Sequence, residues 1–426
     1  MKILILTQYF PPETGAPQNR LYEIALRLKA LGAEVSVLTG FPNYPKYEVF
    51  EAYRGKFYKR EDMDGLDVHR AYIYARPGKG LLNRMLNYCS FVFSSLWIGL
   101  FKVGKAELII CESPPLFLGW TAVWLKRAHR AKLLFNVSDL WPESVLKLGL
   151  VKNPLLLKTS VWLEEWIYKK SDLISGQTQG IVADIRKRFP HKSFFWLKNG
   201  VDAADLNKRL TGRNWRKEHG FAECNLLFYF GGLLGYAQGI DCIIEAATQL
   251  SDLPQVKFVI VGEGPEKERL MRMKQDLGTE NVFFFPGVAK AEIANVIQAM
   301  DVGIIPLRKL DIFRGAIPSK IFEILCLKKP VLLGIEGEAK ALFIEEADSG
   351  WAFEPENAGE LATLIRQINS TPEMLREKGE NGYRYVCQHF DHQQIADDFW
   401  RFLNGSIPER CSGKNQARNS VPGYNP

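Results

Sequence analysis

Short apolar runs alternate with segments of helical periodicity along most of the chain, and this alternation constrains the fold more than any other feature. Residues 3–6 are apolar, and a glycine-containing loop leads to residues 21–28, where apolar side chains recur on one helix face. Gly32 ends that helix and residues 34–39 form the next apolar run. This order is typical of βαβ units, which build parallel sheets covered by helices.

The same pattern continues to residue 403. We predict further strands at 108–111, 132–137, 173–175, 226–230, 257–261, 282–285, 302–306 and 331–333. Helices are predicted between the later strands and at the end of the chain, at 238–250, 265–277, 290–299, 319–328, 337–346, 357–368, 373–388 and 392–403. The predicted fold class is α/β, with two doubly wound Rossmann-like domains that face each other across a cleft. In such sheets ligands bind outside the carboxyl ends of the strands.

A turn at residues 199–202, followed by a polar stretch, marks the predicted hinge between the halves. We expect an N-terminal domain over residues 1–205 and a C-terminal domain over residues 206–385. Residues 386–404 are predicted to form a C-terminal helix that crosses back to the N-terminal domain. Residues 405–426 lack apolar periodicity and are predicted to be disordered.

Composition excludes several classes of protein. The 426 residues carry 55 Lys and Arg against 48 Asp and Glu, and a net charge of +7 spread over a chain of this length, without a known nucleic-acid-binding motif, disfavours nucleic acid as a partner. Seven scattered cysteines without a Cys-x-x-Cys pair predict a reduced, cytoplasmic protein without structural zinc. The six histidines form no metal-binding or hydrolytic pattern, so we predict no metal site. Met1–Thr7 is too short for a signal peptide and is predicted to be a buried strand.

Residues 85–100 are almost free of charge and lie near the lower length limit for a membrane-spanning helix. Their four polar side chains and the βαβ context favour a buried core helix. The alternative is peripheral contact with the anionic inner face of the membrane, because basic residues at 126–132 and aromatic residues at 162–168 lie nearby in the sequence. Solvated charged faces would explain each of these clusters equally well.

The segment Phe313–Glu323 carries the strongest site signal. A strand ends at Pro306 and a helix begins around Ser319, so its N-terminal amides favour an anion such as a diphosphate. Lys320 adds a positive charge that a bound anion would offset, and Glu323 lies one turn later on the same face. Glu323 can accept hydrogen bonds from a sugar or ribose diol. A capping box of Ser319 and Glu323 is the structural alternative, although its spacing is one residue too long.

Two glycine-rich turns follow predicted strands of the second half. The first contains Gly232 and Gly235, and the second is Gly262-Glu263-Gly264-Pro265. Glycine lets the backbone approach a phosphate closely. Both turns also suit ordinary strand-to-helix connections: the first does not match a dinucleotide or NTPase motif, and Gly264-Pro265 in the second suits the start of a helix.

In the first half, the loop containing Gly15, Ala16 and Arg20 leads from the first strand to the first helix. A second segment, Asp139-Leu140-Trp141-Pro142-Glu143-Ser144, follows a later strand at its cleft end. Asp139 and Glu143 are therefore candidate carboxylates that face the second domain. Helix N-capping is an equally simple role for each of them.

These motifs together resemble family 4 of the retaining glycosyltransferases, which have the GT-B fold, over about residues 1–400. Within that family the chain is similar to fucosamine-transferase-like enzymes of bacterial surface-polysaccharide synthesis. The specific motifs are Asp139 to Ser144 and Pro318 to Glu323, and the turn at 199–202 and the glycine turns support them. The resemblance implies transfer of a sugar from a nucleotide-sugar, by analogy a UDP-sugar, with retention of configuration and without a metal or cofactor.

The resemblance also assigns roles to residues. The second domain binds the donor, with Glu323 at the nucleoside ribose and the amides of Gly315, Ala316 and Ile317 at the transferred sugar. The first domain binds the acceptor. The expected acceptor-binding residues are Gly15, Ala16, Arg20 and Trp141. The expected donor-binding residues are Gly232, Gly235, Glu263, Arg308, Arg314, Gly315, Ala316, Ile317, Pro318 and Ser319. The expected catalytic residues are Lys320, Glu323, Asp139 and Glu143.

Three positions depart from the family pattern. Gly315 stands where the family has a carboxylate, Ser138 stands where it has a histidine, and Leu233 and Gln238 replace the Arg and Lys that hold the donor diphosphate. We interpret these changes as features of the subgroup. Lys320, helped by Arg308 or Arg314, is then expected to supply the missing positive charge.

Two other functions remain open from the sequence. A sugar-nucleotide epimerase shares the fold but requires more acid and base groups in the cleft. A non-enzymatic sugar-nucleotide-binding partner in a polysaccharide assembly complex would explain the three departures. The expected acceptor is a saccharide linked to polyprenyl diphosphate, which would place the protein at the cytoplasmic face of the inner membrane; a soluble acceptor is the alternative.

Overall fold

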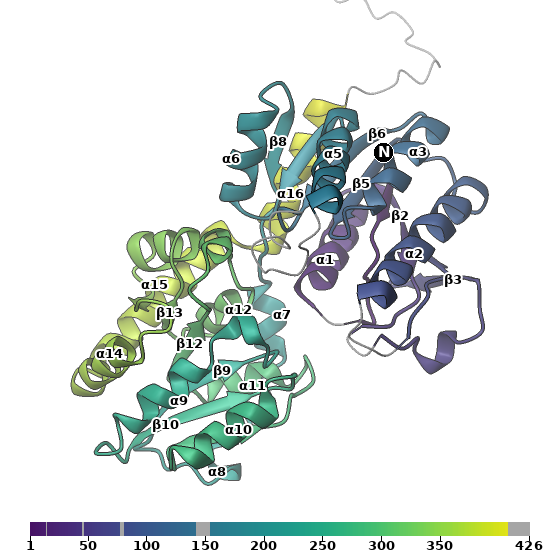
Figure 1. Cartoon of the computed structure of the whole chain (residues 1–426). Coiled ribbons are helices and arrows are strands. Elements are labelled where there is room, and N and C mark those ends of the chain that lie inside the picture. Colours follow the sequence, from purple (N-terminus) through teal and green to yellow (C-terminus); the bar gives the residue numbers. More distant parts are fainter. Residues whose placement is uncertain (14, 45–46, 77–80, 142–153, 408–426) are drawn as a thin grey trace, which may run out of the picture.

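The computed structural model describes residues 1–13, 15–44, 47–76, 81–141 and 154–407. The chain forms two α/β halves, each built on its own sheet (Figure 1). The predicted fold class, two doubly wound Rossmann-like domains, is confirmed.

The N-terminal sheet has eight strands, and all neighbours pair in parallel except β3 and β4. Its central strands are apolar because helices cover both faces. In spatial order the strands are β3 (Tyr58–Met63), β4 (Leu66–Ala71), β2 (Glu34–Gly40), β1 (Lys2–Leu6), β5 (Leu108–Ser113), β6 (Lys132–Val137), β7 (Leu173–Gly176) and β8 (Ser193–Trp196).

Helices from both ends of the chain cover one face of this sheet. α1 (Ala16–Ala30) and the last helix, α16 (His392–Ser406), bury Leu21 and Phe399 in one apolar cluster with Ile3 of β1. The last helix thereby completes the core of the first half. The opposite face is covered by α2 (Leu81–Phe101), α3 (Leu118–His129), α5 (Pro154–Lys170) and α6 (Gln179–Arg188).

The C-terminal sheet has six parallel strands, again buried between helices. In spatial order they are β11 (Val282–Phe285), β10 (Val256–Val261), β9 (Leu226–Gly231), β12 (Val302–Pro306), β13 (Val331–Gly334) and β14 (Gly350–Ala352). One face packs against α9 (Asp241–Thr248), α10 (Lys267–Asp276) and α14 (Ala358–Ser370), and the other against α11 (Ile293–Gln298), α12 (Lys320–Cys326) and α15 (Glu373–His389). Short turns of helix at Tyr236–Gln238, Asp311–Gly315, Glu338–Lys340 (α13) and Ala341–Glu346 lie in the connections.

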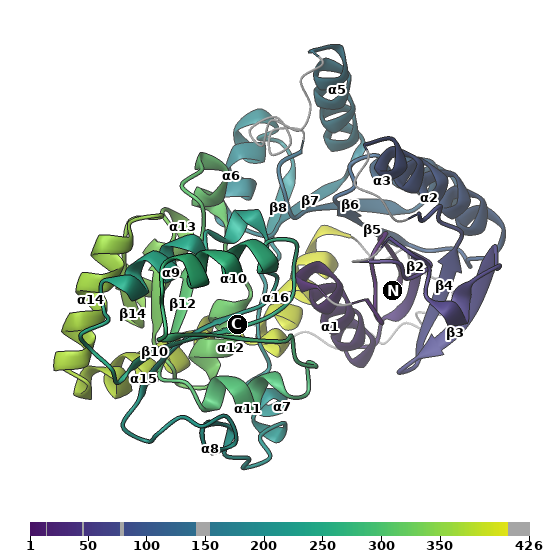
Figure 2. The same cartoon turned by 60° about the horizontal axis from the view of Figure 1, so that its bottom comes forward.

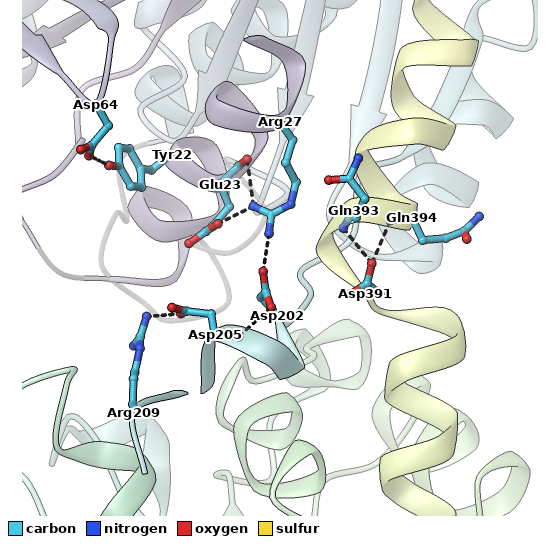
Figure 3. A network of polar contacts seen from close by, with 10 residues as sticks. All are labelled: Tyr22, Glu23, Arg27, Asp64, Asp202, Asp205, Arg209, Asp391, Gln393 and Gln394. Atoms are coloured by element: carbon cyan, nitrogen blue, oxygen red, sulfur yellow. Dashed lines mark hydrogen bonds and ion pairs between the residues drawn. The ribbon is translucent and has the colours of Figure 1, made fainter. Parts of the chain in front are cut away.

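The chain passes between the two halves after β8, near Val201, and again between α15 and α16, near Phe390, and these two segments lie side by side. Between β8 and β9 the chain forms α7 (Ala203–Lys208) and α8 (Trp215–Glu218). The backbone N–H of Val201 donates to Phe390 at 2.9 Å, and that of His392 donates to Val201 at 3.1 Å. Arg27 of α1 binds Asp202 at 2.8 Å, which ties the first helix to this hinge (Figure 3).

A further contact connects the halves across the cleft. The carboxylate of Glu338 in α13 accepts hydrogen bonds from the backbone N–H groups of Gln179, at 2.7 Å, and Gly180, at 2.9 Å. These groups begin α6, so a residue of the second half caps a helix of the first. The contact links α13 of the second half directly to the start of α6 in the first.

Every strand predicted from apolar runs is present, with ends that differ by at most a few residues. Four strands were missed: β3, β4, β8 and β14. β3 is a polar edge strand with the sequence Tyr-Lys-Arg-Glu-Asp-Met, and β14 has only three residues, so neither gives an apolar run. Residues 85–100 lie in α2, which buries Phe91 and Ile98 in the core. Within the described ranges, no helix is long and apolar enough to cross a bilayer.

Candidate active site

A cavity of about 460 Å³ lies between the carboxyl ends of the two sheets, within the size range of small-molecule sites. We call it the cleft cavity. Asp139 and Thr178 line it from the first half, and Gln238, Asp311 and Gly315 line it from the second. The sequence assigned Asp139 to the first domain and Gly315, Ala316, Ile317 and Pro318 to the second. The structure places all of them in the wall of the same cavity.

Lys320 lies beside this cavity at the start of α12. Its ammonium donates to the amide oxygen of Gln238 at 2.9 Å and sits 4.0 Å from the ring centre of Phe230. No carboxylate of the described residues lies within 4 Å of it. Burial lowers the pKa of the Lys320 ammonium to about 7, and the nearby Glu323 raises it only in part. The group is therefore a half-buried amine that titrates near neutral pH and has no carboxylate partner among the described residues.

Glu323 lines a second, smaller pocket, which we call the Glu323 pocket. Arg20 and Asn199 of the first half and Arg209 and Lys290 of the second also line it. Burial raises the pKa of the Glu323 carboxyl, while the charges of Lys290, Arg209 and Lys320 act in the opposite direction. Among the described residues none donates a hydrogen bond to this carboxylate, so its oxygens are available to a ligand hydroxyl.

Ser319 makes no side-chain hydrogen bond at the start of α12, so the alternative of a capping box is not formed. The side chain is exposed and lines the Glu323 pocket. Pro318 and Ile317 lead the chain from the cleft cavity into the helix.

The glycine turns lie next to Lys320. A Cβ atom on Gly232, whose φ is +129°, would lie 3.6 Å from the Lys320 ammonium. The backbone at Gly262 passes so close to the carbonyl oxygen of Gly232 that no side chain fits there. Gly235 begins the turn that carries Gln238, whereas Glu263 is exposed and pairs with Lys267 at 2.7 Å.

Arg308 and Arg314 do not line the cleft cavity. Arg308 pairs with Asp241 and with Glu356, the latter at 2.7 Å, and its Nε donates to the Tyr236 carbonyl. Both arginines line a separate depression, where Arg314 is exposed. Of the three cations expected near the diphosphate, the structure therefore places only Lys320 beside the cavity.

A buried polar network supports the first half of the site. The guanidinium of Arg20 donates to Glu112 at 2.8 Å, to Ser138 at 2.6 Å and to Asn199 at 3.0 Å. Ser138 also donates to Glu112, and Asn136 holds the other oxygen of Glu112 at 2.6 Å. Arg20 and Glu112 are only 3% and 2% exposed, so the pair positions the loop that carries Asp139.

The Asp139 side chain lines the cleft cavity, where it is exposed to solvent on one side and partly desolvated by the protein on the other. This desolvation, together with the charge of Glu112, raises the pKa of Asp139 to about 6, and the guanidinium of Arg20 opposes the shift. A carboxylate with a pKa near neutrality can exchange a proton under physiological conditions.

Trp141 and Gly15, which were expected to bind the acceptor, are not among the described residues that line the cleft cavity. The ring of Trp141 packs edge-on against Phe117 with centroids 5.5 Å apart. Gly15 precedes α1, and Ala16 is its first residue. Glu143 lies outside the described residues.

Sequence reasoning missed several residues of the site. Glu112 directly follows the predicted strand 108–111, and a charged residue at that position is a signal that could have been followed. Thr178 and Asp311 line the cleft cavity without a recognisable motif. Among the described residues, no group of three or more His, Cys, Asp and Glu side chains is arranged to hold a metal ion.

Two family models match this chain and divide it as the two sheets do. The glycosyl transferase 4-like domain matches residues 15–193, and the glycosyl transferases group 1 model matches residues 212–385. The chain belongs to the group 1 glycosyltransferases of the GT-B fold. The fucosamine-transferase subgroup stays a prediction.

Known proteins resemble this group 1 glycosyltransferase over nearly its full length. The putative colanic acid biosynthesis glycosyl transferase WcaI of Escherichia coli K12 is 27% identical over 420 residues, which are 95% of this chain and all of that protein. HepE of Anabaena, solved in complex with UDP, superposes with a TM-score of 0.69 at 19% identity, over 95% of this chain and all of HepE. WaaG, a glycosyltransferase involved in lipopolysaccharide biosynthesis, has a TM-score of 0.64 at 17% identity, over 94% of this chain and all of WaaG.

Proposed function

We propose that this group 1 glycosyltransferase transfers a sugar from a UDP-sugar, with retention of configuration and without a metal, to a saccharide acceptor in cell-surface polysaccharide biosynthesis. The observation that carries the proposal is the half-buried ammonium of Lys320, which lacks a carboxylate partner among the described residues and binds Gln238 in the wall of the cleft cavity. A partly desolvated cation without a counter-charge is costly, and a bound anion would offset that cost.

Lys320 binds the donor diphosphate in this proposal. The ammonium now donates to Gln238, which itself lines the cavity, so a phosphate oxygen can take the place of the amide oxygen. As the bond between the sugar C1 and the phosphate oxygen breaks, the diphosphate gains negative charge. A preorganised cation at this point stabilises the transition state more than the ground state.

Glu323 binds the ribose of the donor nucleoside. Its carboxylate has no hydrogen-bond donor among the described residues, and the charges of Lys290 and Arg209 in the same pocket favour its ionised form. The choice of uridine is supported by HepE, which was solved with UDP, and the shared fold permits a similar donor position. The backbone amides of residues 315–317 would then face the transferred sugar from the cavity wall.

Asp139 orients the acceptor hydroxyl from the opposite side of the cleft cavity. The hydroxyl oxygen attacks C1 on the face that the diphosphate leaves, and the departing phosphate oxygen takes the proton. This route retains the configuration without a protein nucleophile. Closure of the two halves would exclude water and limit hydrolysis of the donor.

The acceptor class follows from the relatives. WcaI is named for colanic acid biosynthesis and WaaG for lipopolysaccharide biosynthesis. We therefore propose O-antigen, capsule or exopolysaccharide as the product class, and a saccharide on polyprenyl diphosphate as the acceptor. Such an acceptor would bring the protein to the cytoplasmic face of the inner membrane.

Thermal unfolding with UDP, GDP, ADP, CMP and NAD tests the donor site. A ligand at 100 times its Kd stabilises a protein by about 2.7 kcal/mol, so we expect a rise in Tm of several degrees with UDP alone. Glu323→Ala should lose the shift, whereas Glu245→Ala, an exposed carboxylate on α9, should keep it. No shift with any nucleotide would overturn the proposal, and UDP binding without sugar transfer would favour the non-enzymatic binding partner.

A further inference from the structure

We propose that the outer side of α2 and α3 docks on an anionic lipid bilayer. We call this surface the aromatic face; it consists of Phe93, Trp97, Leu100 and Phe101 of α2 and Trp120 and Trp124 of α3. Phe93 and Phe101 are 64% and 63% exposed, and Trp97 is 57% exposed. Figure 2 shows the two helices side by side on the outside of the N-terminal sheet.

The aromatic face is not needed to complete the core. The opposite side of α2 packs Phe91 and Ile98 into the N-terminal core. Two serines of the helix also face inward, where Ser94 donates to the carbonyl of Tyr72 at 2.5 Å and Ser95 donates within the helix. The remaining large apolar side chains of the helix are exposed to solvent. An exposed apolar patch of this kind marks an interaction site.

The rings of the aromatic face contact one another. Trp97 and Phe101 lie 4.5 Å apart between centroids, and Phe93 lies 6.1 Å from Trp120, which joins the two helices. Trp120 lies in turn 6.0 Å from Trp124. The patch is therefore continuous across the two helices. Tryptophan and phenylalanine of this kind favour the boundary between lipid headgroups and acyl chains.

Charge distribution identifies the partner as anionic lipid. Neither α2 nor α3 contains an acidic residue. Lys102 and Lys105 are exposed just beyond the end of α2, and the guanidinium of Arg127 lies 5.3 Å from the ring centre of Trp124. A second copy of the chain docked on the same face would bring these basic groups together, whereas an anionic membrane surface attracts each of them.

The aromatic face lies close in the structure to one wall of the cleft cavity. Asp139 and Leu140 line the cleft cavity, and the next residue, Trp141, packs against Phe117, which precedes α3. Trp120 lies in the first turn of α3. If the proposed function holds, a lipid-linked saccharide could reach Asp139 while its lipid stays in the bilayer. The docking of the face itself does not depend on the acceptor.

Flotation on a density gradient tests the docking, with full-length protein and vesicles of phosphatidylcholine alone or with one third phosphatidylglycerol. We expect the wild type to float with the anionic vesicles. The fraction of the double variant Trp97→Ser/Phe101→Ser that binds the vesicles should be at least tenfold lower than that of the wild type. Lys102→Glu/Lys105→Glu should bind vesicles with and without phosphatidylglycerol equally. The matched control is Met271→Ser/Leu277→Ser, which removes two exposed apolar side chains on and after α10 and should float as the wild type does.

Equal flotation of the wild type and the Trp97/Phe101 variant, or no flotation of the wild type, would overturn the docking proposal. So would light scattering that shows a dimer of the wild type and a monomer of the variant, because the face would then bind a second copy. The Tm of each variant, with and without UDP, shows that it is folded and reports on the donor site separately. Flotation without any nucleotide-induced shift would leave the membrane surface standing and remove the transferase proposal.

Discussion

The ammonium of Lys320 donates a hydrogen bond to the amide oxygen of Gln238, 2.9 Å away, and so joins the start of α12 to the loop after β9. In the resembled family a lysine at the position of Gln238 holds the donor diphosphate. Here the amide occupies that position and the cation approaches it from another element. If Lys320 takes over the role of that lysine, as proposed above, its removal should weaken donor binding, which gives the first prediction.

Lys320→Met should weaken UDP binding by about 10- to 100-fold, because a hydrogen bond to a charged group contributes about 1.5–3 kcal/mol. Isothermal titration calorimetry measures this change directly. Lys309→Met is the matched control, since Lys309 is exposed and pairs with Glu354 away from the cleft cavity. A Kd within twofold of the wild type for Lys320→Met would show that another group holds the diphosphate.

Binding of UDP should weaken as the pH rises from 7 to 9. The pKa of Lys320 is about 7 without ligand, so the ammonium is charged below that pH and loses its proton above it. Bound diphosphate favours the charged form, and binding above pH 7 must therefore take up a proton, at up to about a tenfold loss of affinity per pH unit. Lys320→Arg keeps its charge and should give a flat profile. A flat profile for the wild type would contradict the assignment.

Asp139→Asn should lower kcat by about 100-fold and leave the affinity for UDP unchanged, because the residue positions the acceptor hydroxyl and does not contact the donor. The pKa of about 6 implies that activity of the wild type declines below pH 6, as the carboxylate takes up a proton. Asp311→Asn is the matched control in the same cavity. An equal loss of kcat in both variants would point to a general effect of charge in the cavity.

Breaking the buried pair of Arg20 and Glu112 should destabilise the first half. Glu112→Ala leaves the guanidinium buried without its carboxylate, which costs about 3–5 kcal/mol of unfolding free energy. Urea denaturation measures the change. Glu34→Ala removes the partner of Lys2 in an exposed pair and should change the free energy by less than about 1 kcal/mol. Equal losses of unfolding free energy in Glu112→Ala and Glu34→Ala would show that the buried pair does not stabilise the first half.

Removing the contact of Glu338 with α6 should let the two halves separate. Glu338→Ala deletes the acceptor for the N–H groups of Gln179 and Gly180. Small-angle scattering without ligand should then give a larger radius of gyration, and UDP-sugar should reverse part of the change. Glu336→Ala, two residues earlier and paired with Lys340 within its own half, should behave as the wild type. An unchanged radius for Glu338→Ala would mean that other contacts hold the cleft.

Much of the fold was predictable from local pattern. Buried parallel strands such as β5, β6 and β10 contain continuous apolar runs, because helices cover both faces of the sheet, and these runs are easily recognised in the sequence. β3 was not recognised because its side chains are polar and partly exposed at the sheet edge. The helical pattern over residues 85–100 was recognised, but periodicity did not say which side of α2 is buried.

The sequence by itself determined the order of strands and helices, the glycine turns, and the motif around Lys320 and Glu323, because these depend on residues close together in the chain. Tertiary structure decided the partners of each charged group. Arg308 is held by Asp241 and Glu356, and Arg20 meets Glu112, across separations of 48 to 92 positions. Such contacts arise only when strands far apart in the chain pair and bring their carboxyl ends to one edge. The charge available to a ligand depends on those contacts, so it could not be read from the sequence.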